Sequence, residues 1–583
     1  MATAIREERR PTGSEAKLDA EGLHRGVGFV GLLWASEGSL IGSGWLFAAL
    51  TAASIAGPSA IIGWLIASVI VIVLALVHAE LGGLFPVSGG TSRFPHYAFG
   101  SFAGATFGWA SYLQAATVAP IEVLAAIQYL STAHWAKSFY VSHPGGTGTL
   151  SGGGIIAAII LMVIFVIINL VGIRWLARVN NSLTTWKVLI PILTIIVLFA
   201  THFHSSNFSA AGGFFIPHDP LKAILIAIPA GGIVFALLGF EQAVQLGGEA
   251  RDPKDLPRAV ILSILIGAAV YILLQVVFIG ALDPHLLASQ HSWTNLGESN
   301  SNPAVVALNA GPFYTVTKVA GLAWLAFILR LDAVISPGGT GLIYLTSSSR
   351  ISFGLSRNGF IPSAFESTHD RTKAPVVGII VATIIGLLFL LPFPSWASLV
   401  SVVTSSSVLM YAGAPLALAA LRRQKPDLPR LYRLPAAGFL APASFAAASL
   451  IVFWAGWQTY STLMLAMLIG YGLIWASYAF KLNPKRPPMD WGAAAWIIPY
   501  FIGMGIITYL GLGTSGKSGG IIGSIGVFKD VLVGGKDQLG VIGSLVVTIA
   551  FSLVIYFIAV SRRLPEDKVD EYVAEVYPPP VAE

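Results

Sequence analysis

Cysteine is absent from this chain of 583 residues, and charged residues make up only 11% of it. Without a thiol, the protein forms no disulfide and uses no thiolate as a nucleophile or metal ligand. Hydrophobic residues account for 55% of the chain, which leaves too few polar side chains to cover the surface of a water-soluble globule. The composition therefore predicts a protein that lies in a lipid bilayer.

Motifs of several enzyme classes are also missing. The sequence has no Walker loop, no Ser-His-Asp order and no metalloprotease helix. Five histidines fall in predicted loops without a helical metal-ligand spacing, namely His202, His204, His218, His285 and His291. We therefore expect no enzymatic activity, no ATP drive, no metal site and no cofactor.

Apolar stretches of about 20 residues recur along the chain, each long enough to cross roughly 30 Å of hydrocarbon. We predict fourteen transmembrane helices, at 27–50, 59–83, 101–130, 153–173, 183–202, 221–248, 259–282, 313–347, 375–395, 397–421, 437–458, 460–480, 491–512 and 540–561.

Lysine and arginine are unevenly distributed between the two sides of the predicted membrane. With the N-terminus in the cytoplasm, most of the 34 lie on the inner side, and few lie in the outer loops, namely Lys137, Lys517, Lys529 and Lys536. Such a bias is typical of membrane proteins with positive cytoplasmic loops. We expect a multi-pass protein of the cell (plasma) membrane with cytoplasmic tails at 1–26 and 562–583. The net charge of +6 then reflects topology rather than nucleic-acid binding.

Glycine interrupts two of the predicted helices. The first carries Ile-Gly-Ser-Gly at 41–44, and the sixth, five helices later, carries Gly231-Gly232. Such breaks are tolerated in lipid only where they are buried or line a cavity, although glycines also serve close helix packing. Because five is odd, the two units enter the membrane from opposite sides and predict an inverted repeat with a mid-membrane site. The predicted units are 27–202 (first repeat), 221–421 (second repeat) and 437–561 (accessory helices).

Motifs around the breaks resemble the amino acid/polyamine/organocation superfamily of secondary transporters. The matching stretches are Ile41-Gly42-Ser43-Gly44, Ala56-Gly57-Pro58, Ala79-Glu80-Leu81-Gly82-Gly83-Leu84-Phe85-Pro86, Gly239-Phe240-Glu241, Gly248-Glu249-Ala250-Arg251-Asp252-Pro253 and Ser349-Arg350. Asp332-Ala333 with Ser336-Pro337-Gly338-Gly339 is similar to the bacterial aspartate:proton symporter branch. The resemblance implies an all-α membrane protein with a five-plus-five inverted-repeat (LeuT-like) transporter core and about four additional transmembrane helices.

The resemblance also implies an amino acid substrate held by the backbone at the breaks. Freed amides can donate to a carboxylate at a helix N-terminus, and freed carbonyls can accept from an ammonium group. The candidate substrate-binding residues are Ser39, Ile41, Gly42, Ser43, Gly44, Phe235, Ala236, Leu238 and Phe240. Phe235 and Phe240 are candidate gates, and the alternative is that they only pack.

Lys187 on the fifth helix matches the position at which proton-coupled relatives carry a lysine in place of a sodium ion. Its ammonium can bridge carbonyls of the first helix and a hydroxyl of the eighth, with Ser336 and Thr340 as candidates. A buried lysine of this kind can load and release a proton. The alternative is that Lys187 lies near the cytoplasmic end and snorkels to the interface.

Five other ionisable residues inside the predicted helices are candidates for a functional role, because a charge there costs at least about 2.5 kcal/mol. Glu122 is a candidate proton carrier, and so is Glu37. Arg330 is a candidate partner for the side-chain carboxylate of an acidic substrate. The alternative for each of these, and for Glu241 and Asp332, is structural pairing.

The sequence thus predicts a secondary active transporter, a proton-coupled amino acid symporter that works by alternating access with H⁺ as the coupling ion. The alternatives are an exchanger of amino acids or polyamines and, from a different class, a channel or a transporter-like nutrient sensor. We expect a small-molecule amino acid and the lipid bilayer as partners, no nucleic acid, and a candidate oligomer interface on the accessory helices.

Overall fold

The computed structural model describes residues 25–141, 148–171, 173–216, 218–369, 372, 374–390, 396–511 and 538–574. Within these ranges the regular structure is helical except for isolated bridges and a short antiparallel pair, β1 (Tyr140–Val141) and β2 (Thr149–Leu150). Eleven helical segments are long and apolar enough to cross a membrane. The protein is therefore an all-α membrane protein. Lys517, Lys529 and Lys536 lie outside the described residues.

Each of the fourteen predicted spans overlaps one helix or a broken set of helices, although the eighth helix begins and ends ten residues later than the predicted 313–347. The first five spans hold α1 (Phe29–Leu40) with α2 (Gly44–Ala56), α3 (Ala60–Leu84), α5 (Ser101–Leu130), α6 (Gly152–Val171) and α7 (Ile173–Thr201). The next five hold α8 (Pro220–Ala230) with α9 (Ile233–Ala236) and α10 (Gln242–Gln245), α11 (Asp255–Ala281), α15 (Ala323–Arg357), α16 (Val376–Leu390) and α17 (Trp396–Gln424). The last four hold α18 (Ala437–Trp454), α19 (Gly456–Ala479), α20 (Trp491–Ala494) with α21 (Ile497–Leu510), and α24 (Gly540–Ser561).

Further short helices lie between or after these spans, and of these only α14 falls within a predicted span. They are α4 (Gly90–Phe99), α12 (Pro284–Gln290), α13 (Pro303–Ala310), α14 (Pro312–Val319) and α25 (Glu566–Val573), with 3₁₀ turns η1 (Gly57–Ser59), η2 (His134–Phe139), η3 (Ser205–Ser209), η4 (Gly247–Glu249), η5 (Trp293–Leu296) and η6 (Ser363–Glu366). Proline in the first turn and a capping side chain explain two of them. Asp283 caps α12, and Asn302 caps α13 by accepting the N–H of Ala304 at 2.9 Å.

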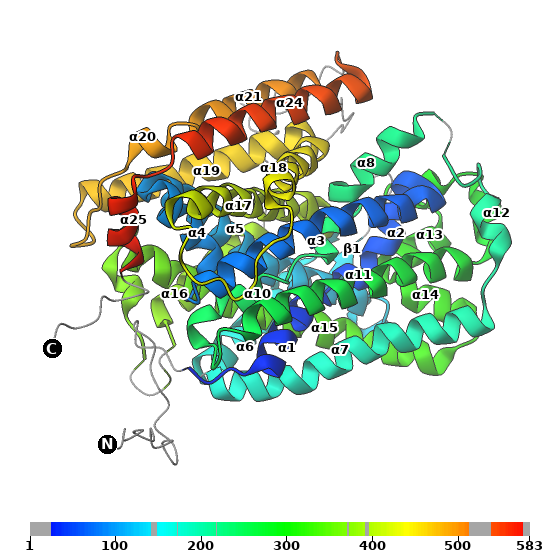
Figure 1. The fold of residues 1–583 in the computed structure, drawn as a ribbon. Coiled ribbons are helices and arrows are strands. Elements are labelled where there is room, and N and C mark those ends of the chain that lie inside the picture. The colour runs from blue at the N-terminus through cyan, green and yellow to red at the C-terminus, as the bar shows by residue number, and fades with distance from the viewer. Residues whose placement is uncertain are drawn as a thin grey trace, which may run out of the picture.

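The bundle is built around α5, whose residues from Ser101 to Tyr129 are all buried. Helix α15 packs along it, and α1, α7 and α11 pack against one another beside α15. The accessory helices α18, α19, α21 and α24 lie together on one flank, against α17 and α3 (Figure 1). The start of α1 and helix α25 lie toward one end of the bundle, which we call the terminal end, while α12 and α13 lie at the opposite, distal end (Figure 1).

Both broken spans meet at the centre of the bundle. Gly239 has a φ of +128°, and a Cβ at this position would lie 2.6 Å from the backbone nitrogen of Leu40 in α1. Only glycine allows both this backbone angle and this approach of the two chains. The second break therefore lies directly against the first.

Candidate functional site

A side chain from α5 binds the backbone at the break in the first span. The Glu122 carboxylate accepts the backbone N–H of Ser43 at 2.7 Å and the Ser43 hydroxyl at 3.0 Å. The indole N–H of Trp396 on α17 donates to the same hydroxyl at 2.8 Å. Because α2 begins at Gly44, the Glu122 carboxylate lies at the N-terminus of a helix, where an anion is favoured.

Lys187 is fully buried, so its side chain does not snorkel to the membrane surface. Its ammonium donates to the backbone carbonyl of Gly38 on α1 and, at 2.8 Å, to the hydroxyl of Thr340 on α15. The Thr340 hydroxyl in turn donates to the Gly38 carbonyl at 2.8 Å. Of the two hydroxyls named from the sequence, Thr340 contacts the lysine, whereas Ser336 donates to Asp332 at 2.8 Å.

Asp332 on α15 is surrounded by neutral donors. The indole N–H groups of Trp45 on α2 and Trp186 on α7 donate to its two carboxylate oxygens at 3.1 and 2.8 Å. Arg330, two residues earlier, lies elsewhere. Its guanidinium donates to the hydroxyl of Tyr314 and covers that ring at 4.4 Å, so it does not reach the break.

Glu241 holds the second break in place from inside the bundle. Its carboxylate accepts the N–H of Gly239 at 2.8 Å and the hydroxyls of Tyr344 and Tyr411 at 3.1 and 2.6 Å. The side-chain amides of Gln114 and Gln242 also donate to it. This carboxylate is thus engaged from several sides, and one of its partners is the backbone of the second break.

Glu37 differs from the other buried acids. It lies one turn before the first break, its side chain is fully buried, and neither carboxylate oxygen has a hydrogen-bond partner. A carboxylate without partners is costly in this environment, so the neutral acid is the favoured form.

A cavity of about 10 Å³ remains between the two breaks, with room for about one water molecule. Its lining consists of Ser39, Leu40, Gly42, Gly44, Val118, Glu122, Phe235, Leu238, Thr340 and Tyr344. The cavity is therefore too small in this conformation to hold a molecule of the size of an amino acid.

Several residues named from the sequence do not line this cavity. Phe240 packs between His78 and Tyr411, away from it. Ala236 lies so close to Gly44 that a Cβ there would be 2.9 Å from its Cα. Ile41 is fully buried next to the break. Sequence reasoning missed Leu40, Val118 and Tyr344, which line the cavity, although Leu40 directly precedes the break that the glycines mark.

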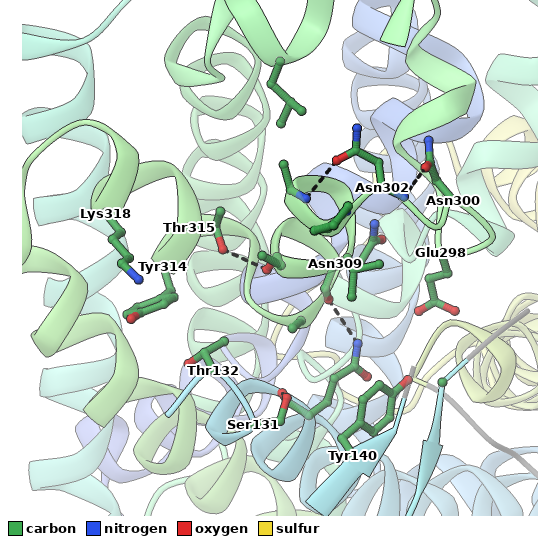
Figure 2. A pocket seen from close by; sticks show the side chains of 18 of the residues that line it. Ser131, Thr132, Tyr140, Glu298, Asn300, Asn302, Asn309, Tyr314, Thr315 and Lys318 are labelled. Atoms are coloured by element: carbon green, nitrogen blue, oxygen red, sulfur yellow. Dashed lines mark hydrogen bonds between the residues drawn. The ribbon is translucent and has the colours of Figure 1, made fainter. Parts of the chain in front are cut away.

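A second, much larger hollow of about 1390 Å³ lies at the distal end (Figure 2). It is lined by the end of α5, η2, β1 and the helices α12 to α14, with Asn302, Asn309 and Tyr314 among its polar side chains. It contains no residue of either break, so it is separate from the central cavity.

Comparison with known proteins decides the family. The sequence model described as "Amino acid permease" matches residues 27–474, which include both breaks, Glu122, Lys187 and Asp332. The chain belongs to the amino acid permease family. It is thus an amino acid transporter of the amino acid/polyamine/organocation superfamily, with the LeuT-like fold and additional helices.

This permease resembles several curated transporters over most of its length. It is 35% identical over 500 residues to the glutamate/serine transporter AimA of Bacillus subtilis, covering 86% of this chain and 89% of the relative. It is 33% identical over 484 residues to the aspartate-proton symporter of the same organism, covering 82% and 89%. The human large neutral amino acids transporter small subunit 2 is 27% identical over 484 residues, covering 80% and 83%.

Proposed function

We propose that this permease is a proton-coupled symporter of acidic amino acids or serine, which works by alternating access at the two breaks. The observation that carries the proposal is the buried ammonium of Lys187, which joins Gly38 on α1 to Thr340 on α15. The names of the two Bacillus subtilis relatives, a glutamate/serine transporter and an aspartate-proton symporter, support the substrate class and the coupling ion.

Glu122 supplies the link between substrate and proton. Its carboxylate occupies the Ser43 amide, the group that would receive the α-carboxylate of an amino acid. Two carboxylates cannot share this amide without strong repulsion. Protonation of Glu122 removes its charge and weakens its bond to the amide, so proton uptake and substrate binding favour each other.

Lys187 supplies the link between proton and conformation. While charged, it ties α1 to α15 through the Gly38 carbonyl. On losing a proton to the cytoplasm, the amine keeps at most a weak hydrogen bond to that carbonyl, and α1 is held there mainly by the neutral Thr340 hydroxyl and moves more easily. The neutral amine then takes the proton of Glu122, which restores both groups and carries one proton inward per cycle. Each proton that moves inward releases about 2.3 kcal/mol per 100 mV of membrane potential, which drives accumulation.

We assign the terminal end to the cytoplasm of a cell that carries the protein in its plasma membrane. The arginines at this end support the assignment, among them Arg251, Arg350 and Arg422. The two repeats at 27–202 and 221–421, the accessory helices at 437–561 and both cytoplasmic tails are parts of the same proposal.

The test is uptake by proteoliposomes that contain the purified protein. Labelled glutamate, aspartate and serine are offered with an inward proton gradient, without a gradient, and with a protonophore. We expect saturable accumulation above the equilibrium level only with the gradient, together with proton entry reported by an internal pH dye. Uptake that merely equilibrates, or that ignores the protonophore, contradicts proton-coupled symport.

A further inference from the structure

The two halves of the first broken span are held by the same two helices, but through different side chains. Lys187 of α7 and Thr340 of α15 bind α1 at the carbonyl of Gly38. The preceding residue of α7, Trp186, and Asp332 of α15 lie at the other half. There the Asp332 carboxylate accepts the indole N–H of Trp45, the second residue of α2.

The Asp332 carboxylate connects α2 to two other helices. The carboxylate is fully buried and accepts hydrogen bonds from α2, from α7 and from Ser336 of its own helix. A hydrogen bond to a charged acceptor in a buried environment is worth more than one between neutral groups. Trp45 is two residues after Ser43, so this bond ties the start of α2, directly after the break, to α15.

We propose that Asp332 is a positioning residue that latches α2, and with it the distal gate, independently of the Lys187 contact that holds α1. Release of Asp332 opens the central cavity toward the distal end and leaves the terminal end closed. Release of Lys187 opens the opposite side. The proposal rests on the proposed alternating access, and it assigns one of the two gates to a side chain outside the central cavity.

The chain offers two matched reporter positions for this latch. Ala48 lies one turn after Gly44 on the same face of α2, and Ala35 lies one turn before Ser39 on the same face of α1, where Gly44 and Ser39 both line the cavity. Both alanines are buried, with 0% and 5% of their surface exposed. Because the natural chain has no cysteine, Ala48→Cys or Ala35→Cys introduces the only thiol.

The experiment measures the rate at which N-ethylmaleimide labels each single cysteine in the purified full-length protein, followed by mass spectrometry. In the Ala48→Cys background, Asp332→Asn and, separately, Trp45→Phe are expected to raise the rate about tenfold or more, since each removes a buried charge-assisted bond. In the Ala35→Cys background, the same variants are expected to leave the rate unchanged. Lys187→Ala is expected to raise the labelling rate of Ala35→Cys and to leave that of Ala48→Cys unchanged.

Trp45→Phe keeps the carboxylate and its bond to Trp186, and therefore serves if Asp332→Asn fails to fold. The latch would be overturned if these variants raised the labelling rate of Ala48→Cys and Ala35→Cys equally. It would also be overturned if Trp45→Phe left the labelling rate of Ala48→Cys unchanged. This readout needs no transport, so it is independent of the proteoliposome assay. Loss of proton coupling with an intact labelling pattern would refute the proposed symport alone.

Discussion

The carboxylate of Glu122 and the backbone N–H of Ser43 lie 2.7 Å apart, with the helix α2 beginning at the next residue. An acid of the protein thus occupies the N-terminus of a helix in the middle of the membrane, where the carboxylate of an amino acid substrate is proposed to bind. In the proposed mechanism Glu122 therefore competes with the substrate for this amide, and a proton on Glu122 relieves the competition.

Glu122→Gln tests this competition. The amide oxygen still accepts the Ser43 N–H, but it carries no charge at any pH and is a weaker acceptor, so it yields more easily to a carboxylate. We expect substrate affinity that is at least equal to wild type and no longer depends on pH, together with loss of proton-driven accumulation. Binding is measured by thermal shift at an acidic and an alkaline pH, and counterflow shows that the carrier still cycles. An unchanged pH dependence contradicts the role of Glu122.

Gly42 tests the tightness of the cavity. A Cβ at this position would lie 2.7 Å from a Glu122 oxygen and 2.8 Å from the Thr340 hydroxyl. We expect Gly42→Ala to lower substrate affinity roughly tenfold or more, because overpacking costs about 1–3 kcal/mol. Gly338→Ala on α15 is the control, since its nearest atom lies 4.0 Å away. Saturation binding measures the substrate affinity of both variants. If the two affinities are equal, Gly42 is not part of the substrate site.

Lys187→Ala tests the coupling step. The variant lacks the ammonium that binds Gly38 and Thr340, so no proton can be carried at this position. We expect proton-driven accumulation to be abolished while exchange of internal for external substrate persists. The measurement compares net uptake under a pH gradient with counterflow in the same vesicles. Undiminished accumulation excludes Lys187 from the mechanism.

The sequence predicts part of this site and not the rest, for a physical reason. Glycine marks the first break because a Cβ at Gly42 or Gly44 would lie within 3 Å of a neighbouring atom, and it marks the second because Gly232 and Gly239 have positive φ angles. This signal is local in the sequence. The contacts of Glu122 with Ser43 and of Asp332 with Trp45 join helices far apart in the chain. Which face of each helix meets its neighbour depends on packing, which hydrophobic runs do not encode.

The same limit applies to the fold. Spans of about 20 apolar residues are visible in sequence because the bilayer fixes their length. Helix α4 has ten residues with polar side chains among them, so it gives no such signal, although it packs against α5 and α17. The charge of Arg330 suits an acidic substrate, yet its guanidinium donates to the Tyr314 hydroxyl and the Thr132 carbonyl, near the distal end.

Glu80, at the terminal end of α3, is expected to contribute strongly to the stability of the protein. Its buried carboxylate is bound by Arg422 at 2.5 and 2.9 Å, by Arg430 at 3.0 Å and by the N–H of Leu434 at 2.7 Å. Glu80→Gln leaves these cations without their counter-charge. We expect a loss of about 3–5 kcal/mol, as for other broken buried pairs. Glu366→Gln is the control.

The control removes the half-exposed pair between Glu366 and Arg357, which are 3.6 Å apart. Pairs of this kind contribute about 0–1 kcal/mol. Thermal unfolding midpoints in detergent compare the stability of the two variants, and Glu80→Gln is expected to have the lower midpoint. A Glu80→Gln protein as stable as Glu366→Gln contradicts a structural role for the cluster.

His96 on α4, between the spans α3 and α5, gives the protein an acid sensitivity. Burial, and secondarily the nearby Arg93, lower the pKa of His96 to about 4. In the unfolded chain this histidine titrates near 6.5. Between these two values the unfolded chain binds a proton that the folded protein does not, so the stability falls as the pH falls from about 6.5 toward about 4.

We expect this histidine to account for up to about 3 kcal/mol of that loss, since each pKa unit corresponds to about 1.4 kcal/mol. His96→Gln removes the titrating group, so its unfolding midpoint is expected to fall less steeply across this range than that of wild type. His285→Gln, at an exposed position on α12, is the matched control and keeps the wild-type slope. If the two variants have the same slope, the buried imidazole is not the source of the acid sensitivity.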